Sequence, residues 1–120
     1  ERFYSENPNS QLFIIGGYGS IKEQVEEYAE QSKASDAIFI ITGSTNPFPL
    51  IKFMDAFILS STYEGLPIVF FEMMQLDMPI ISTDIPGPSE FLKQGYGLVV
   101  ENSTEGLLNG MQQAALDKIP

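Results

Sequence analysis

The chain has 120 residues, enough for one domain with a single hydrophobic core and too few for two. Its formal charge of −10, with only six basic residues, argues against a nucleic-acid partner and against direct docking on anionic lipid. The absence of histidine and cysteine excludes imidazole bases, thiol nucleophiles, disulfides and zinc sites built from these side chains. No run approaches the roughly 18 apolar residues of a membrane span, and no cleavable leader is found. We therefore expect a cytoplasmic chain without direct membrane insertion.

The N-terminal part of the chain predicts a strand, a glycine turn and a helix. Residues 1–10 are polar and end in a turn cluster, so we expect the tail of a truncated segment. The apolar run 11–15 is typical of a strand buried on both faces, and Gly16 begins a glycine-rich turn. Ser20 and Glu23 form a capping box before a helix with an apolar face. The glycine turn does not complete a dinucleotide-binding fingerprint, because Lys22 occupies the position of the third glycine. We therefore interpret the turn as a tight strand-to-helix connection.

The remaining elements continue this alternation of strands and helices. Further apolar runs predict strands, and other stretches predict a short helix and a C-terminal helix capped by Asn102 and Glu105. A helical turn around Phe91 is expected to stop at Gly95. The predicted strands are residues 37–41, 55–61, 78–83 and 98–100, the short helix is 48–54, and a rigid loop covers 84–90.

One stretch stands out, because Glu64 and Glu72 bracket seven residues without another charge. Glu72 lies in the apolar run 66–76, which predicts a helix that is hydrophobic all round and therefore buried. A buried ionised carboxylate without a partner costs roughly several kcal/mol, so Glu72 needs hydrogen-bond donors. Gly65 suits the turn that leads into this helix, and Pro67 suits its first helical position.

Strands alternate with helices along the chain, and the strands are continuous apolar runs rather than apolar and polar residues in turn. This pattern predicts an α/β fold, a Rossmann-like open parallel sheet with helices on both faces. Ligands bind such sheets beyond the carboxyl ends of the strands. The loops that begin at Gly16, Gly43, Thr62 and Asp84 are all expected to emerge at that end, together with the stretch between the two glutamates.

Several ordered motifs in residues 11–111 resemble the donor-nucleotide half of a GT-B glycosyltransferase, and are most similar to glycosyltransferase family 4. They are an aspartate-led strand, a carboxylate-x7-carboxylate motif, a strand ending in Thr-Asp and a glycine-punctuated closing strand. The corresponding segments are residues 55–61, 64–72, 79–84 and 95–100. The resemblance implies that residues 1–120 form a single, partial donor-binding domain of a larger enzyme, the C-terminal half of a GT-B fold.

The resemblance also implies roles for individual residues. Glu72 would accept hydrogen bonds from the ribose hydroxyls of a nucleotide-sugar donor, and Glu64 would act as the catalytic residue facing the transferred sugar. The helix start would offer backbone N–H groups to the diphosphate. Gly43 and Ser44 would lie near the base. Implied donor-binding residues besides Glu72 are Gly16, Gly43, Ser44, Gly65, Leu66, Ile68 and Val69.

Members of this family retain anomeric configuration and generally need no metal, so no cofactor and no metal site are expected. Residues 1–10 match neither the family's opening strand nor its basic loop, and Pro86-Gly87-Pro88 replaces its paired glycine. An N-terminal acceptor-binding domain of the parent chain is the expected partner, and without it we expect the isolated chain to be inactive. The resemblance suggests a cell-envelope or polysaccharide acceptor and a parent enzyme peripheral at the inner face of the membrane.

Other interpretations of the same residues remain open. Glu64 is alternatively a surface loop residue, Glu72 a cap for a neighbouring backbone N–H, and Glu90 either a local structural group or a site residue. At the level of the whole chain, the alternatives are a non-catalytic flavodoxin-like ligand-binding domain and an inert fragment. A receiver domain would need an acidic pair after its first strand, where the glycine turn at 16–19 offers none.

Overall fold

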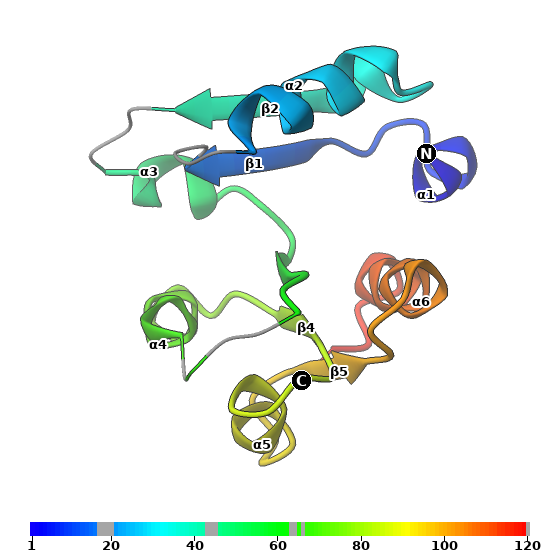
Figure 1. The fold of residues 1–120 in the computed structure, drawn as a ribbon. Helices are drawn as coiled ribbons and strands as arrows, with labels where there is room; N and C mark the ends of the chain where they lie inside the picture. The colour runs from blue at the N-terminus through cyan, green and yellow to red at the C-terminus, as the bar shows by residue number, and fades with distance from the viewer. Residues whose placement is uncertain (17–20, 43–45, 63–64, 66, 120) are drawn as a thin grey trace. The chain divides into compact units, whose positions relative to one another are not determined.

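The computed structural model describes residues 1–16, 21–42, 46–62, 65 and 67–119. The chain divides into two compact units, Glu1–Pro49 and Leu50–Pro120, and every described strand pair in them is parallel (Figure 1). The predicted α/β class and the parallel strand direction are therefore confirmed. The described ladders form a two-stranded and a three-stranded sheet, where the sequence predicts one sheet.

The first unit is a two-stranded parallel sheet whose strands β1 and β2 are connected through helix α2. Phe13 and Phe39 are register partners, and their rings stack with centroids 5.1 Å apart. Glu1 accepts a hydrogen bond from the Lys33 backbone N–H at 3.1 Å, which lowers the pKa of its carboxyl group. The elements are α1 (Arg2–Glu6), β1 (Leu12–Gly16), α2 (Lys22–Gln31), the 3₁₀ helix η1 (Ser35–Ala37) and β2 (Ile38–Thr42).

The second unit is a three-stranded parallel sheet in the order β3-β4-β5. Helices α4 and α5 lie on one side of this sheet and α6 on the other (Figure 1). Helix α3, Phe48–Ile51, precedes the sheet and begins in the first unit. The other elements are β3 (Phe57–Leu59), α4 (Ile68–Gln75), β4 (Ile80–Thr83), α5 (Pro88–Leu92), β5 (Leu98–Val100) and α6 (Thr104–Ala115).

The described core of the second unit lies between the sheet and helices α4 and α5. Phe70 and Met73 of α4 are fully buried against Ile80 of β4 and Leu92 of α5, and Met78 joins them. Successive residues of a strand point to opposite faces, so Ile81 meets α6, where a Cβ on Gly110 would lie 2.9 Å from its Cγ2 atom. Both faces of β4 are thus covered.

Burial on both faces holds for β4, all of whose residues are buried, but the same prediction is wrong for β1 and β2. Those two strands are half-buried or exposed along their length. A continuous apolar run therefore marks a strand here without fixing how deeply the strand is covered. In helix α2 the expected apolar face is also incomplete, because Ile21 is 60% and Tyr28 79% exposed.

Element boundaries differ from the predicted ones by a few residues. Helix α1 lies within the predicted N-terminal tail, α3 ends before residue 54, and α5 begins inside the predicted loop 84–90. The Ser103 side chain caps α6 by accepting from the Gly106 N–H at 3.0 Å, so the predicted cap Asn102 is one residue off. Helix α2 begins at Lys22 without a side-chain cap, and Ser20 lies outside the described residues.

Candidate functional site

The segment between β3 and β4 carries the candidate site at the start of helix α4. The helix begins at Ile68, one residue later than predicted, because Pro67 takes the N-cap position with extended backbone, φ −70° and ψ 127°. Its first closed turn is a hydrogen bond from the Phe70 N–H to the Pro67 carbonyl at 3.1 Å. A helix that connects two parallel strands starts at the carboxyl end of the first strand. The start of α4 therefore lies at the carboxyl edge of the sheet, where ligands bind in such folds.

The first turn of α4 presents backbone donors at this edge. The N–H groups at the start of a helix have no partner four residues earlier, and they form the positive end of the helix dipole. Ile68 and Val69 supply two such groups, and the Ile68 side chain is 75% exposed. Pro67 supplies none. This arrangement suits an anionic group, as the sequence predicts for both residues.

Gly65 lies two residues before the N-cap of α4 and is exposed. Its φ lies outside the left-handed region, and a Cβ built on it would meet nothing within 4 Å. Neither backbone conformation nor packing against the described residues therefore requires glycine here. Glycine also serves where a ligand approaches the backbone closely.

Glu72 is the fifth residue of α4 and is half-buried. Among the described residues its side chain makes no hydrogen bond and no ion pair, so neither an ionic partner nor the neighbouring backbone cap considered for it is found there. The helix places Glu72 about 6 Å along its axis from Ile68, at about 1.5 Å per residue. A carboxylate and the helix N-terminus thus lie within the span of one small ligand.

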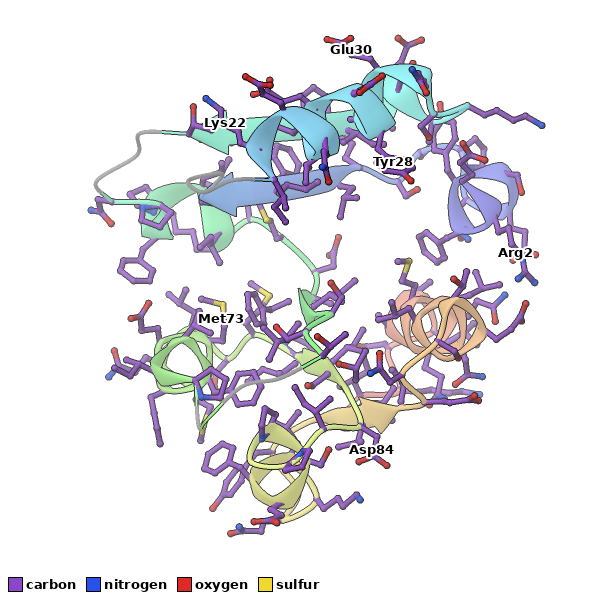
Figure 2. All side chains as sticks on the ribbon, viewed as in Figure 1. Arg2, Lys22, Tyr28, Glu30, Met73 and Asp84 are labelled. Carbon is purple, nitrogen blue, oxygen red and sulfur yellow. The ribbon has the colours of Figure 1, made fainter. Side chains whose placement is uncertain are left out.

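Helix α4 is less buried than its sequence predicts. Phe70 and Met73 are fully buried, and Figure 2 labels Met73 on this helix, but Ile68 is 75% and Phe71 44% exposed. The prediction of a helix buried on all sides is therefore wrong. Half-burial also lowers the cost of holding Glu72 without a donor, because water still reaches part of the side chain.

The end of β4 connects to this segment through a side chain. Thr83 is fully buried, and its hydroxyl donates to the Ser61 carbonyl at 2.6 Å, across 22 residues of sequence. The Asp84 N–H donates to the Val100 carbonyl at 2.8 Å on the other side. The sequence motif located Thr83 and Asp84 but assigned no function to Thr83, since no local pattern reveals its distant partner.

The loop between β4 and α5 is held by a chain of hydrogen bonds. The Ser89 hydroxyl donates to the Asp84 carboxylate at 2.7 Å and accepts from the Ile85 N–H at 2.9 Å. Lys93 Nζ lies 3.7 Å from the same carboxylate, which Figure 2 labels. Gly87, with φ of 88°, caps α5 ahead of Pro88, a conformation that favours glycine. The predicted rigid loop is thus partly the first turn of a helix.

Of the predicted site residues, four lie on one described segment of the second unit: Gly65, Ile68, Val69 and Glu72. Gly16 ends β1 in the first unit, with φ of 122°. Glu64, Leu66, Gly43 and Ser44 lie outside the described residues, so their predicted functions stay predictions. Glu90 is exposed in the first turn of α5, and its carbonyl accepts from Gln94 Nε2 at 3.2 Å.

Three further features of the described residues bear on the kind of site. Groups of three or more carboxylates that could hold a metal ion do not occur in the described ranges. None of the described helices combines the length and the apolar character that a bilayer crossing needs. Lys22 Nζ lies 3.9 Å from a carboxylate oxygen of Glu26, so part of its positive charge is neutralised within the chain.

The chain shares its fold with solved structures of the GT-B type. It superposes on the crystal structure of TarM with a TM-score of 0.80 and 24% identity, covering 97% of this chain and 23% of TarM. The apo form of the lipopolysaccharide outer core galactosyltransferase WaaB gives 0.77 and 21%, covering 98% of this chain and 36% of WaaB. The likeness establishes the fold, which is the one the sequence motifs predict.

The family follows from the sequence. The profile described as "Glycosyl transferases group 1" matches residues 2–119, and the chain belongs to this family. An uncharacterized glycosyltransferase of Methanocaldococcus jannaschii is 33% identical over 93 residues, 77% of this chain and 23% of that protein. The Vi polysaccharide biosynthesis protein VipC/TviE of Salmonella typhi is 29% identical over 103 residues, 85% of this chain and 18% of that protein.

A third relative is the Escherichia coli UDP-Gal:alpha-D-GlcNAc-diphosphoundecaprenol alpha-1,3-galactosyltransferase, 24% identical over 111 residues. That alignment covers 90% of this chain and 29% of the relative. The chain therefore spans about a fifth to a third of the length of these curated relatives.

Proposed function

We propose that this chain is the donor-binding part of a retaining glycosyltransferase of family 4, and that it binds a nucleotide-diphosphate sugar at the start of helix α4. Family membership supports the reaction class, and the arrangement of α4 supports the location. In this proposal residues 1–120 form one partial domain of a longer enzyme, whose N-terminal domain binds the acceptor.

The observation that carries the proposal is the isolated carboxylate of Glu72 on the site-forming helix. It is half-buried and has no hydrogen-bond or ion-pair partner among the described residues. A carboxylate accepts hydrogen bonds only, and a ribose diol offers it two donors at the right separation. Glu72 therefore recognises the ribose, while the Ile68 and Val69 N–H groups, about one turn earlier, face the diphosphate.

Glu64, eight positions before Glu72, is the catalytic residue in this proposal. It binds the transferred sugar or stabilises the positive charge that develops at its anomeric carbon, an electrostatic function that a carboxylate performs well in a water-poor site. Gly43 and Ser44 contact the base, and Gly16, Gly65 and Leu66 line the donor. The reaction retains anomeric configuration and uses no metal or other cofactor.

The acceptor in this proposal is a cell-envelope or polysaccharide-type glycan. Two named relatives support this class, since one is a Vi polysaccharide biosynthesis protein and one acts on a diphosphoundecaprenol-linked sugar. The parent enzyme would work in the cytoplasm, peripherally at the inner face of the membrane. The flavodoxin-like alternative has no support from the family match, whereas the inert-fragment alternative makes a distinct experimental prediction.

Titration calorimetry of the chain with a panel of nucleoside diphosphates tests the proposal. We expect binding that depends on the base and that weakens at least about tenfold in Glu72→Ala, since one hydrogen bond to a charged group contributes ~1.5–3 kcal/mol. Glu30→Ala is the matched control, because it also removes one negative charge but lies on the exposed side of α2 (Figure 2). A wild-type chain that binds no nucleoside diphosphate, or equal losses in both variants, would refute the proposal.

A further inference from the structure

Strand β2 forms an open edge of the first unit. Its ladder with β1 runs from Leu12↔Ile38 to Gly16↔Thr42 without interruption, and β1 is its only strand partner among the described residues. The outer edge of such a strand presents backbone N–H and C=O groups that no neighbouring strand uses. An added strand could therefore bond to β2 through its backbone.

This edge lacks the features that usually prevent a sheet edge from pairing. Natural edge strands are commonly protected by charged residues, proline or a bulge. Strand β2 consists of four apolar residues and a threonine, Ile38–Thr42, and its register shows no bulge. Its residues are half-buried or exposed, and Phe39 is 39% exposed. The strand is thus suited in both composition and access to pairing with a further strand.

A groove of about 350 Å³ lies beside β2, on the face that helix α2 covers. Its apolar part comes from alternate residues of the strand, which share one face, and from one residue of the helix. Its acidic part comes from α2 and from the 3₁₀ helix η1, and Figure 2 labels Glu30 on α2. The apolar lining residues are Ala29, Ile38 and Ile40, and the acidic ones are Glu26, Glu30 and Asp36.

The charge of this groove selects the kind of partner. Glu30 and Asp36 are exposed, and their side chains have no hydrogen-bond or ion-pair partner among the described residues. None of the described lining residues is basic. A second copy of the chain would bring the same carboxylates and a net charge of −10 to this edge, so like charges oppose self-association. A positively charged strand meets no such repulsion.

We propose that the outer edge of β2 and the acidic groove beside it bind an extended basic segment of another protein, which adds to the sheet as a strand. Alternate side chains of the added strand face the groove. Lysine or arginine fits there, because the aliphatic stem packs on Ile38 and Ile40 while the charged end reaches Glu30 and Asp36. The intervening side chains lie on the face of Phe39 and are apolar. This inference is independent of the proposed function.

Three synthetic peptides test the proposal with the 120-residue chain. The first alternates lysine with valine and matches the inferred partner. The second replaces every lysine by glutamate, which keeps the strand-forming pattern and reverses the charge. The third is the lysine–valine peptide with N-methylated backbone amides, which keeps every charge but cannot bond to a strand edge. The third peptide therefore separates strand addition from general attraction to an acidic protein.

Calorimetric titration at low ionic strength compares the peptides and two matched double variants. We expect the first peptide to bind with a Kd at least about tenfold below that of either control peptide. Glu30→Gln with Asp36→Asn should raise this Kd about fivefold, as expected for two exposed ion pairs. Glu23→Gln with Glu27→Gln removes the same charge from residues of α2 that do not line the groove, and should change Kd less than about twofold.

Amide hydrogen exchange measured by NMR locates the bound peptide. The first peptide should slow exchange at alternate amides of residues 38–42 and leave those of the other edge strand β5 unchanged. Equal binding of the N-methylated peptide, equal losses in the two double variants, or protection outside β2 would overturn the proposal. Dimerisation through β2 would assign this edge to a second copy instead. Amides of β2 that are already protected in the complete enzyme would assign the edge to the parent chain, and either result would also overturn the proposal.

Discussion

Replacing Gly65 by alanine tests whether glycine is needed at this position for ligand binding or for the fold. A Cβ at residue 65 meets nothing within 4 Å, and the φ of Gly65 lies outside the left-handed region. Alanine therefore fits the folded backbone and restricts the unfolded chain, which raises the free energy of unfolding by about 0.4–1 kcal/mol. Stability alone then favours alanine at this position.

Gly97→Ala is the structural comparison for the same substitution. Its Cβ would lie 2.7 Å from the Ile80 carbonyl oxygen and 3.0 Å from Leu92 Cδ2, both in the fully buried core. The Ile80 backbone belongs to β4 and cannot shift without disturbing the ladder. We expect Gly97→Ala to lower the free energy of unfolding by about 1–3 kcal/mol, the usual cost of overpacking. Urea denaturation monitored by circular dichroism measures both variants.

Donor affinity gives the second half of the Gly65 prediction. If the diphosphate sugar approaches the backbone at residue 65, the added methyl group costs about 1–3 kcal/mol of binding, roughly a 5- to 150-fold rise in Kd. Calorimetric titration of Gly65→Ala with the nucleotide sugar that the wild type binds measures this change. A variant less stable than the wild type by more than about 1 kcal/mol, or one with unchanged Kd, would refute the reasoning.

Two further predictions concern stability. Glu72→Gln should change the free energy of unfolding by less than about 0.5 kcal/mol in the absence of ligand, because no described residue bonds the carboxylate; a clear loss in urea denaturation would indicate a structural function. Ser103→Ala should lower the free energy of unfolding by about 1 kcal/mol, because it removes the hydroxyl that accepts from the Gly106 N–H at 3.0 Å. Asn102→Ala should lower it by less than half as much. Thermal unfolding measures both variants, and the reverse order would show that Asn102 is the cap.

The order of elements was predictable because each apolar run is bounded by glycine, proline or polar residues. Strand β5 has the predicted bounds, Leu98–Val100, and the other strands begin and end within a few residues of theirs. Depth of burial was not predictable in the same way. Runs such as 37–41 and 78–83 look alike in sequence, yet only the strand in the second run lies in the centre of its sheet with helices on both sides.

The misassigned details depend on contacts that short patterns do not contain. The exposed Ile68 and Phe71 of α4 look like core residues in the sequence, and only packing shows which side of the helix meets the sheet. The aromatic Phe71 still makes an edge contact with Phe91, with ring centroids 5.4 Å apart, so exposure does not mean isolation. Helix ends shift by one residue because Ser103 and Asn102 are both good caps.

The start of the helix that carries the candidate site was predictable from one short segment of sequence. The carboxylate pair and Pro67 predicted where α4 starts, because the spacing of residues along a single helix follows directly from their sequence positions. The contact between Thr83 and Ser61 joins residues 22 apart, and its existence depends on β3 ending one residue earlier than β4 does. That information lies in the register of the sheet, which no motif encodes.

The charge balance explains which parts of a donor this chain is suited to bind. Lys93 at the carboxyl edge lies 3.7 Å from Asp84, so the pair adds no net positive charge there. The start of α4 contributes about 0.3–1 kcal/mol toward an anion, while a chain of net charge −10 repels one. Attraction for the diphosphate is therefore weak within these residues. In the proposed function, hydroxyl recognition by Glu72 and Glu64 belongs to this chain, and most of the charge that neutralises the phosphates comes from other parts of the enzyme.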